Sequence, residues 1–252
     1  MLLILLGFLV GVIGTLVGAG GGFILSPILL IAYPKETPEM LTGISLAVIF
    51  VNALSGSVAY ARMRRILYRY GILFAAAAMP GAILGVHAVA LVSRRTFDLL
   101  LALLLIVGSM YLFATASPRQ TGQSDGCVVL SRPKLIAGIF LSALIGFVSG
   151  FLGIGGGIIH VPLLCLLFGF PVHYATATSH FILAITAGTA MVTHIAAGTY
   201  AAVVNRTALL CLGVVAGAQV GARLSRIVKG ILIMRILAIA LLGVGIRLML
   251  LR

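Results

Sequence analysis

The chain has 252 residues, of which 62% are hydrophobic and 8% charged, and its mean hydropathy is +1.27. This composition excludes a soluble globular domain, and the lack of strand-like alternation argues against a membrane barrel. A net charge of +13 would suggest a nucleic-acid partner, but nearly all basic residues stand at the ends of apolar runs, as the positive-inside rule predicts for membrane proteins. We therefore expect an all-α membrane protein that contacts the lipid bilayer and no nucleic acid.

Apolar segments follow one another along the whole chain and predict 8–10 transmembrane helices. They fall at about 1–17, 20–33, 41–61, 70–92, 97–116, 134–152, 155–170, 176–197, 206–223 and 230–251. The first segment lacks a positively charged start, so we expect a retained helix and not a cleaved signal peptide. The second is short, and it is expected either to span the membrane or to be re-entrant.

Two copies of one glycine cassette lie at matching places, 135 residues apart. The first copy runs from Gly18 to Leu29 and the second from Gly153 to Leu164. In each copy a glycine triplet is followed five residues later by proline, a combination that interrupts helices. Interrupted apolar segments at corresponding positions of a repeat indicate the binding site of a transporter.

The two halves of the chain also correspond outside the cassettes. Residues 43–45 match residues 177–179, and residues 80–85 match residues 216–221. We expect the glycines of the second pair of matches to allow close helix packing. The long polar stretch between the halves predicts three regions: 1–116, a first repeat of transmembrane helices; 117–133, a cytoplasmic linker; and 134–252, a second repeat of transmembrane helices.

Loop charge predicts that the repeats are inverted. If each half crosses the membrane five times, one side receives the basic residues Arg62, Arg64, Arg65, Arg69, Arg223, Arg226 and Lys229, and the other only Arg94, Arg95 and Arg206. Four crossings per half would leave no such bias, so the positive-inside rule favours five. The loop that contains Glu36 and Glu39, and both termini, would then lie outside.

The glycine breaks are expected to bind an anion. A backbone freed from a helix inside a membrane must be buried in protein or face a watery cavity, and a half-helix that starts there presents free N–H groups and a partial positive charge. Glycine also lets a ligand approach the main chain closely. Ser26 and His160 follow the two breaks and add side-chain donors.

Polar clusters at the start of the next helices extend this site, since polar groups in hydrocarbon face a bundle interior or a cavity. Their alternative role is local hydrogen bonding to the preceding helical turn. The candidate substrate-binding residues are Gly20, Gly21, Gly22, Ser26, Thr42, Ser45, Asn52, Gly155, Gly156, Gly157, His160, Thr178, Ser179 and His180.

Other chemistry finds little support in the sequence. The acids Glu36, Glu39, Asp98 and Asp125 lie outside the predicted spans or at their ends, which argues against a carboxylate proton relay. The cysteines have no metal or redox spacing, and no carboxylate or cysteine joins the histidines, so we expect no metal and no cofactor. Nucleophile elbows, phosphate-binding loops and metalloprotease patterns are absent, so an enzyme is not expected.

With these motifs in view, the chain resembles the TauE/SafE family of membrane proteins, named for sulfite export. The resemblance rests on the two cassettes, the Thr/Ser clusters after them and the Pro-Gly-Ala or Ala-Gly-Ala turns of the fourth segments, and it covers nearly the whole chain. It implies a secondary transporter of small sulfur-containing anions, such as sulfite, sulfoacetate or other organosulfonates, in the bacterial inner membrane.

The sequence thus predicts an anion carrier with its site between the glycine breaks, working by alternating access. An anion channel that uses the same half-helix dipoles is the alternative. A membrane-embedded enzyme and a structural subunit are weaker hypotheses. The sequence does not identify the substrate or the direction of transport. Helix faces made of small residues are compatible with a homodimer.

Overall fold

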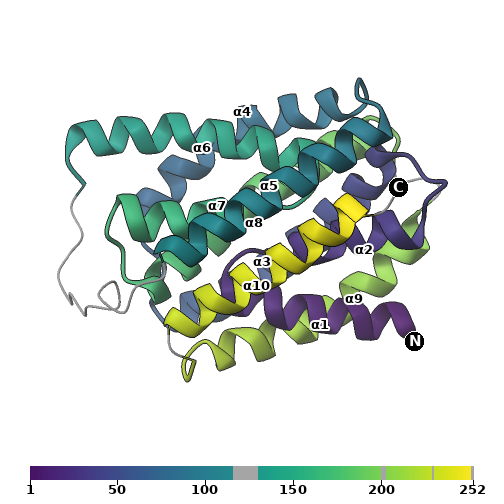
Figure 1. The fold of residues 1–252 in the computed structure, drawn as a ribbon. Coiled ribbons are helices and arrows are strands. Elements are labelled where there is room, and N and C mark those ends of the chain that lie inside the picture. The colour runs from purple at the N-terminus through teal and green to yellow at the C-terminus, as the bar shows by residue number, and fades with distance from the viewer. Residues whose placement is uncertain (116–129, 200–202, 229, 251–252) are drawn as a thin grey trace.

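Helices form all the regular structure in the part of the chain that the computed structural model describes, which is residues 1–115, 130–199, 203–228 and 230–250 (Figure 1). The elements are α1 (Leu2–Val17), α2 (Gly22–Ala32), α3 (Pro38–Arg62), α4 (Tyr68–Val89), α5 (Arg94–Thr115), α6 (Arg132–Leu152), α7 (Gly157–Pro162), the π-helical η2 (Leu163–Leu167), α8 (Val172–Ala196), α9 (Val204–Leu224) and α10 (Gly230–Leu250). Each predicted apolar segment coincides with one helix or with α7 and η2 together. The all-α prediction is therefore confirmed.

Five helices, α3, α4, α6, α8 and α9, are long and apolar enough to cross a membrane in the part of the chain that could be assessed. The helices α1 and α2 and the stretch from Gly157 to Leu167 are apolar but shorter. The predicted linker, 117–133, lies mostly outside the described residues, and its last two positions belong to α6.

The predicted helix breaks occur where the glycine triplets stand. The helix α1 ends at Gly18, whose φ of 80° is left-handed, and Gly20 and Gly21 have φ values of 74° and 80°. In the second half Gly153 and Gly155 have φ values of 64° and 71°. Because an L side chain rarely adopts this conformation, the breaks depend on glycine.

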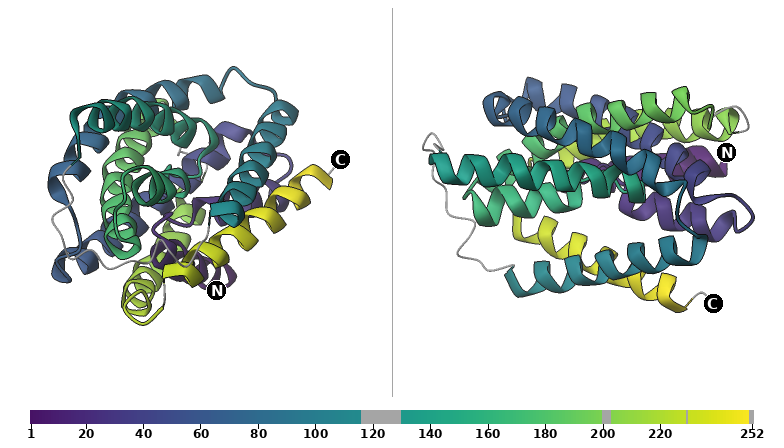
Figure 2. Two further views of the ribbon diagram at one scale, coloured as in Figure 1. Left: turned by 60° about the vertical axis from the view of Figure 1, so that its left-hand side comes forward. Right: turned by 90° about the horizontal axis from the view of Figure 1, so that it is seen from above.

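The two halves exchange their first helices. The helix α1 packs along α9, and its counterpart α6 packs along α4; α9 in turn packs on α3, and α4 on α8. The equivalent helices α3 and α8 pack on each other, and so do α5 and α10, which lie together along one side of the bundle (Figure 2). The principal inter-half pairings thus occur in matching pairs, as an approximate two-fold relation requires.

The bundle has two distinct ends. The N- and C-termini lie at one end, which we call the N/C end, whereas α5 finishes and α6 begins at the opposite end, the α5–α6 end (Figures 1 and 2). The Leu130 N–H donates to the Tyr70 hydroxyl at 3.1 Å, which places the start of α4 at the α5–α6 end. The first half therefore runs from the N/C end to the α5–α6 end, and the second half runs back.

Glycines of α4 and α9 allow these helices to touch the backbone of α6 and α1, respectively. A Cβ atom at Gly81 would collide with the carbonyl oxygen of Ala143 in α6, and one at Gly217 with the carbonyl oxygen of Phe8 in α1. Equivalent collisions would occur at the other two glycines of these motifs, Gly85 and Gly221. The prediction that these glycines serve close packing is confirmed.

We expect Gly81→Ala to destabilise the protein by about 1–3 kcal/mol, because the new methyl group would separate α4 from α6. Gly243→Ala is the control: its Cβ would meet nothing within 4 Å, so the higher helix propensity of alanine should leave stability unchanged or raise it by roughly 1 kcal/mol. Thermal unfolding in detergent measures both, and equal melting temperatures for the two variants would contradict this account of the packing.

Candidate functional site

The two glycine breaks meet inside the bundle. A Cβ atom at Gly22 would lie 2.6 Å from the carbonyl oxygen of Ile154, and one at Gly157 would lie 2.6 Å from the Cα atom of Ala19. The six glycines predicted to bind the anion are all buried. Two segments far apart in sequence thus form one continuous backbone surface.

Serine hydroxyls tie each break to the other half of the chain. The Ser45 hydroxyl in α3 donates to the Gly153 carbonyl at 2.6 Å, and the Ser26 Oγ lies 2.7 Å from the same carbonyl oxygen and 2.9 Å from Ser45 Oγ. At the equivalent place in α8, the Ser179 hydroxyl donates to the Gly18 carbonyl at 3.2 Å. Three predicted site residues therefore lie at the breaks, where they satisfy the last carbonyls of α1 and α6.

The backbone N–H groups at the breaks are only partly used. Those of Ala19 and Gly20 both donate to the Gly14 carbonyl, at 2.9 and 3.1 Å, and that of Gly157 donates to the Gly155 carbonyl. Within the described residues, the N–H groups of Gly21, Gly22, Gly155 and Gly156 have no acceptor. These four are the donors that the breaks can offer to a ligand.

A buried polar network supports the first break. The Asn52 amide donates to the Gly20 carbonyl at 2.9 Å and accepts from the Thr15 hydroxyl at 2.9 Å. The Nε2 atom of His180 lies 3.3 Å from Thr15 Oγ1, and the Tyr60 hydroxyl donates to the Thr15 carbonyl at 2.7 Å. The structure thus brings the predicted Asn52 and His180 together, and adds Thr15 and Tyr60, whose lone hydroxyls in apolar runs gave no distinctive signal.

Three other predicted residues make their hydrogen bonds away from the breaks. The Thr42 hydroxyl donates to the Glu39 carbonyl at 2.9 Å. This is the hydrogen bond to the preceding helical turn that was the alternative to a role in the site. The Thr178 hydroxyl accepts from the Leu67 N–H at 3.0 Å, and His160 Nε2 lies 3.3 Å from Ser142 Oγ. Two of them nevertheless contact a break: the backbone and side chain of Thr42 lie against Gly153, and His160 Nδ1 would lie 3.3 Å from a Cβ atom at Gly156.

Two apolar side chains that the sequence did not single out close the site. A Cβ atom at Gly20 or at Gly155 would contact Ile49 Cγ2, at 3.0 and 2.8 Å respectively, and would also meet the methyl groups of Leu183. Ile49 lies near the middle of α3 and Leu183 near the middle of α8, at equivalent positions. Each of these side chains therefore covers both breaks, half-way along the spanning helices.

Two cavities in the described structure lie away from the glycine breaks. One of about 560 Å³ is bounded by α3, α8 and the start of α4, and another of about 740 Å³ by α5, α6, α7 and η2. Both are lined almost entirely by apolar side chains, and no cassette glycine lines either. The buried glycines at the meeting point of the breaks are covered by Ile49 and Leu183 in this conformation.

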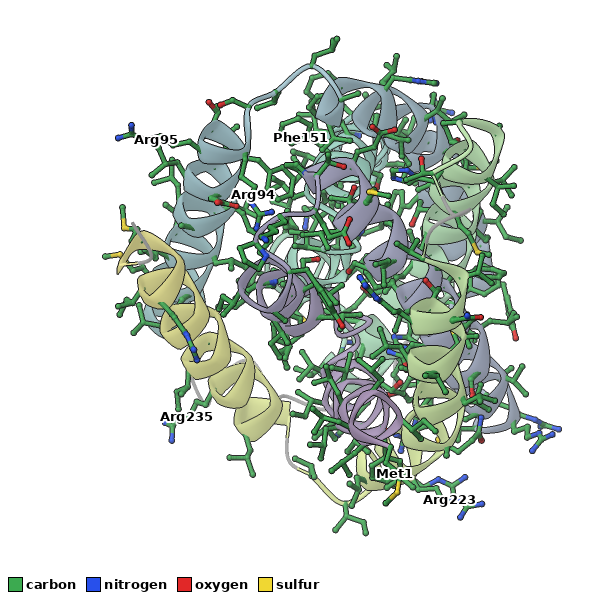
Figure 3. The ribbon with its side chains drawn as sticks, turned by 90° about the vertical axis from the view of Figure 1, so that its right-hand side faces the viewer. Met1, Arg94, Arg95, Phe151, Arg223 and Arg235 are labelled. Atoms are coloured by element: carbon green, nitrogen blue, oxygen red, sulfur yellow. The ribbon has the colours of Figure 1, made fainter. Side chains whose placement is uncertain are left out.

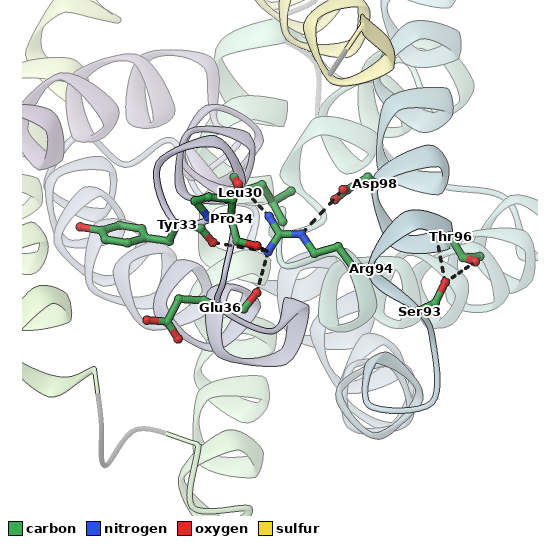
Figure 4. Close-up of polar contacts among 8 residues, drawn as sticks. All are labelled: Leu30, Tyr33, Pro34, Glu36, Ser93, Arg94, Thr96 and Asp98. Carbon is green, nitrogen blue, oxygen red and sulfur yellow. Dashed lines mark hydrogen bonds and ion pairs between the residues drawn. The ribbon is translucent and has the colours of Figure 1, made fainter. Parts of the chain in front are cut away.

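The short helix α2 is held at the N/C end by an arginine that points inward. Figure 3 shows Arg94 directed into the bundle and Arg95 directed away from it. The Arg94 guanidinium donates to carbonyl groups at and after the end of α2, with distances from 2.6 to 3.4 Å, and pairs with Asp98 at 3.7 Å (Figure 4). The four carbonyls belong to Leu30, Tyr33, Pro34 and Glu36.

Charge is distributed unequally between the two ends. All carboxylates among the described residues, those of Glu36, Glu39 and Asp98, lie in the elements that meet at the N/C end. There Glu36 pairs with Arg206 at 3.2 Å, and the Thr199 hydroxyl lies 3.4 Å from a Glu39 carboxylate oxygen. The described basic residues in the loops and helix ends of the α5–α6 end are Arg62, Arg64, Arg65, Arg69, Arg132, Lys134, Arg223 and Arg226.

A bundle of apolar helices, with two interrupted helices that meet at its centre, defines a multi-pass membrane protein of the transporter class. The sequence profile of the family described as sulfite exporter TauE/SafE matches residues 3–248. The chain therefore belongs to the TauE/SafE family of membrane transporters, and the resemblance inferred from its motifs is confirmed.

Related proteins extend this result. The chain is 30% identical to the probable membrane transporter protein YunE of Bacillus subtilis, over 97% of this chain and 95% of that protein. It is 26% identical to a probable membrane transporter protein of Methanocaldococcus jannaschii, over 81% of this chain and 75% of that protein. No solved structure matches the chain significantly.

We expect Arg94→Gln to lower the stability of the protein by roughly 1.5–3 kcal/mol, the usual cost of losing hydrogen bonds to a charged group, because the end of α2 would lose its shared donor. Arg95→Gln removes the same charge from the next position, where the side chain points outward, and should change stability by less than about 0.5 kcal/mol. Thermal unfolding in detergent compares the two, and equal losses of stability would show that Arg94 does not hold α2.

Proposed function

We propose that this protein is a secondary transporter that exports small sulfur-containing anions, such as sulfite, sulfoacetate or other organosulfonates, across the bacterial plasma membrane. The observation that carries the proposal is the meeting of two glycine breaks at the centre of the bundle. Their four unpaired N–H groups can bind an oxyanion without any basic side chain, and the positive ends of α2 and α7 add to the attraction.

An inverted arrangement of the two halves supports transport by alternating access. The halves run in opposite directions between the two ends of the bundle (Figure 1). The basic α5–α6 end corresponds to the cytoplasm under the positive-inside rule, and the N/C end to the outside. The breaks would then lie near the bilayer midplane, and movement of one half against the other would expose them to each side in turn.

The sealed centre favours a carrier over a channel. Ile49 and Leu183 cover both breaks at once, so an anion reaches the N–H groups only after these side chains move. A carrier passes through such a closed state in every cycle, whereas an open pore would need a continuous path. We therefore propose that the described conformation is the occluded one.

Counterflow tests the function directly. Purified protein in liposomes preloaded with unlabelled sulfoacetate or sulfite should accelerate the uptake of the labelled anion, and preloading with chloride should not. Flux without counterflow would indicate the channel instead. Lack of flux with every sulfur anion would overturn the proposed substrate class.

We expect the double variant Ile49→Ala, Leu183→Ala to lose the coupling between influx and efflux. Its counterflow should fall several-fold relative to net efflux, because the seal over the breaks would be open in more of the population. Leu210→Ala is the control: it truncates an equally buried side chain of α9, at a residue whose backbone lies against Gly7 of α1 and not at the breaks. If the double variant and the control kept the same ratio of counterflow to net efflux, the assigned gating role would be wrong.

A further inference from the structure

Buried polar atoms without hydrogen-bond partners lie at the α5–α6 end, outside the site described above. Within the described part of the chain, Arg65 Nη1, His173 Nδ1 and Thr176 Oγ1 are buried atoms that have no hydrogen-bond partner. The turn that carries Arg65 lies against the start of α8, where the Leu67 N–H donates to the Thr178 hydroxyl at 3.0 Å. Unsatisfied buried donors cost free energy, so their concentration in one place calls for a ligand.

The turn after α3 directs Arg65 to this place. The Arg65 N–H donates to the Tyr60 carbonyl at 3.3 Å and the Arg64 N–H to the Ala61 carbonyl at 2.9 Å. Arg64 adopts a left-handed φ of 55°, a position that glycine usually fills in this type of helix end. The chain thus folds back over the helix end, and Arg65 is half-buried while Arg62 is exposed.

The start of α8 adds main-chain donors beside these side chains. Pro171 occupies the N-cap position and has no side chain that could accept a hydrogen bond. Its carbonyl takes the N–H groups of Tyr174 and Ala175, which leaves those of Val172 and His173 without an acceptor in the described structure. Because α8 is 25 residues long, the helix dipole also places a partial positive charge at its N-terminus.

A polar stripe leads from this position to the first glycine break. His173, Thr176 and His180 share one face of α8, at the spacing that aligns side chains on a helix. A Cβ atom at Gly18 would lie 2.7 Å from Thr176 Cγ2, and His180 belongs to the network around the Gly20 carbonyl. Both Thr176 and His180 are at most 1% exposed, and His180 Nδ1 likewise has no hydrogen-bond partner.

At the N/C end, the two residues equivalent to His173 and Arg65 form a hydrogen-bonded pair and need no ligand. There Glu39 in α3 stands where His173 stands in α8, and Thr199 after α8 stands where Arg65 stands after α3. The Thr199 hydroxyl lies 3.4 Å from a Glu39 carboxylate oxygen, so donor and acceptor are paired. At the α5–α6 end the two positions carry Arg65, whose guanidinium can only donate, and His173, so the group that would complete them is an anion.

We propose that Arg65, His173 and the N-terminus of α8 form an outer anion site at the cytoplasmic mouth of the transporter. The site takes a small oxyanion, a sulfonate or a sulfite-like ion, and passes it along the stripe of Thr176 and His180 to the glycine breaks. This inference rests on the proposed function and adds to it the place at which the anion is first bound.

Transport from the cytoplasmic side tests the outer site. In everted membrane vesicles, Arg65→Gln should raise the KM for labelled sulfoacetate about tenfold and leave the maximal rate within about twofold, since a charged hydrogen-bond partner is lost at a binding step. Arg62→Gln removes the same charge from the exposed last residue of α3 and should change KM less than about twofold. Arg65→Lys, which keeps the charge, should recover most of the loss.

Equal KM values for Arg65→Gln and Arg62→Gln would overturn the outer site and leave the proposed function standing. A lower maximal rate with an unchanged KM would also overturn it, because that pattern indicates a structural role. Lack of saturable uptake by the unmodified protein would instead count against the proposed function.

A second measurement needs neither transport nor an Arg65 variant. In a chain whose three cysteines, Cys127, Cys165 and Cys211, are replaced by alanine, His173→Cys places a thiol in the outer site. An anionic methanethiosulfonate should label it about tenfold faster than a cationic one of similar size. Sulfoacetate should slow the labelling and chloride should not. Equal rates for the two reagents, or no protection by sulfoacetate, would overturn the site.

Discussion

The structure depends on one constraint: backbone groups freed from a helix must find partners inside a membrane, where water supplies none. The left-handed glycines end α1 and α6 far from either surface, so the freed carbonyls and N–H groups have to be buried in protein. Ser45 and Ser179 satisfy the carbonyls from the other half of the chain. The N–H groups that remain are the proposed anion-binding groups, so the constraint that shapes the fold would also create the binding site.

This constraint accounts for the exchange of helices between the halves. If α1 packed only within its own half, the two breaks would face lipid or lie apart. Packing α1 along α9, and α6 along α4, brings both breaks to the centre, and the glycines of α4 and α9 let the exchanged helices approach backbone to backbone. Because Ile49 and Leu183 each cover both breaks, the two halves are coupled, and neither break can be opened without disturbing the seal of the other.

Much of this could be predicted from the sequence, because the patterns concerned are local. Hydropathy located the helices and the glycine triplets located the breaks, and the predicted residues Ser26, Ser45, Ser179 and Asn52 have side-chain hydrogen bonds to break carbonyls. Residues whose role depends on rotation about a helix axis were harder. Thr42 and Thr178 have the same chemistry as Ser45 but direct their hydroxyls elsewhere, and Ile49 and Leu183 look like any other apolar residues until the two helices are packed together.

The departures from two-fold symmetry bear on the direction of transport. A symmetric carrier would hold an anion equally at both mouths, but here the basic mouth has unpaired donors, whereas the carboxylates Glu36 and Glu39 at the opposite mouth have their donors within the protein. On the proposed topology the anion would therefore be collected on the cytoplasmic side, where the proposed outer site lies. Each negative charge moved outward also gains about 2.3 kcal/mol per 100 mV of inside-negative potential. Charge placement and membrane potential would therefore act in the same direction, so the proposed export would need no coupled ion.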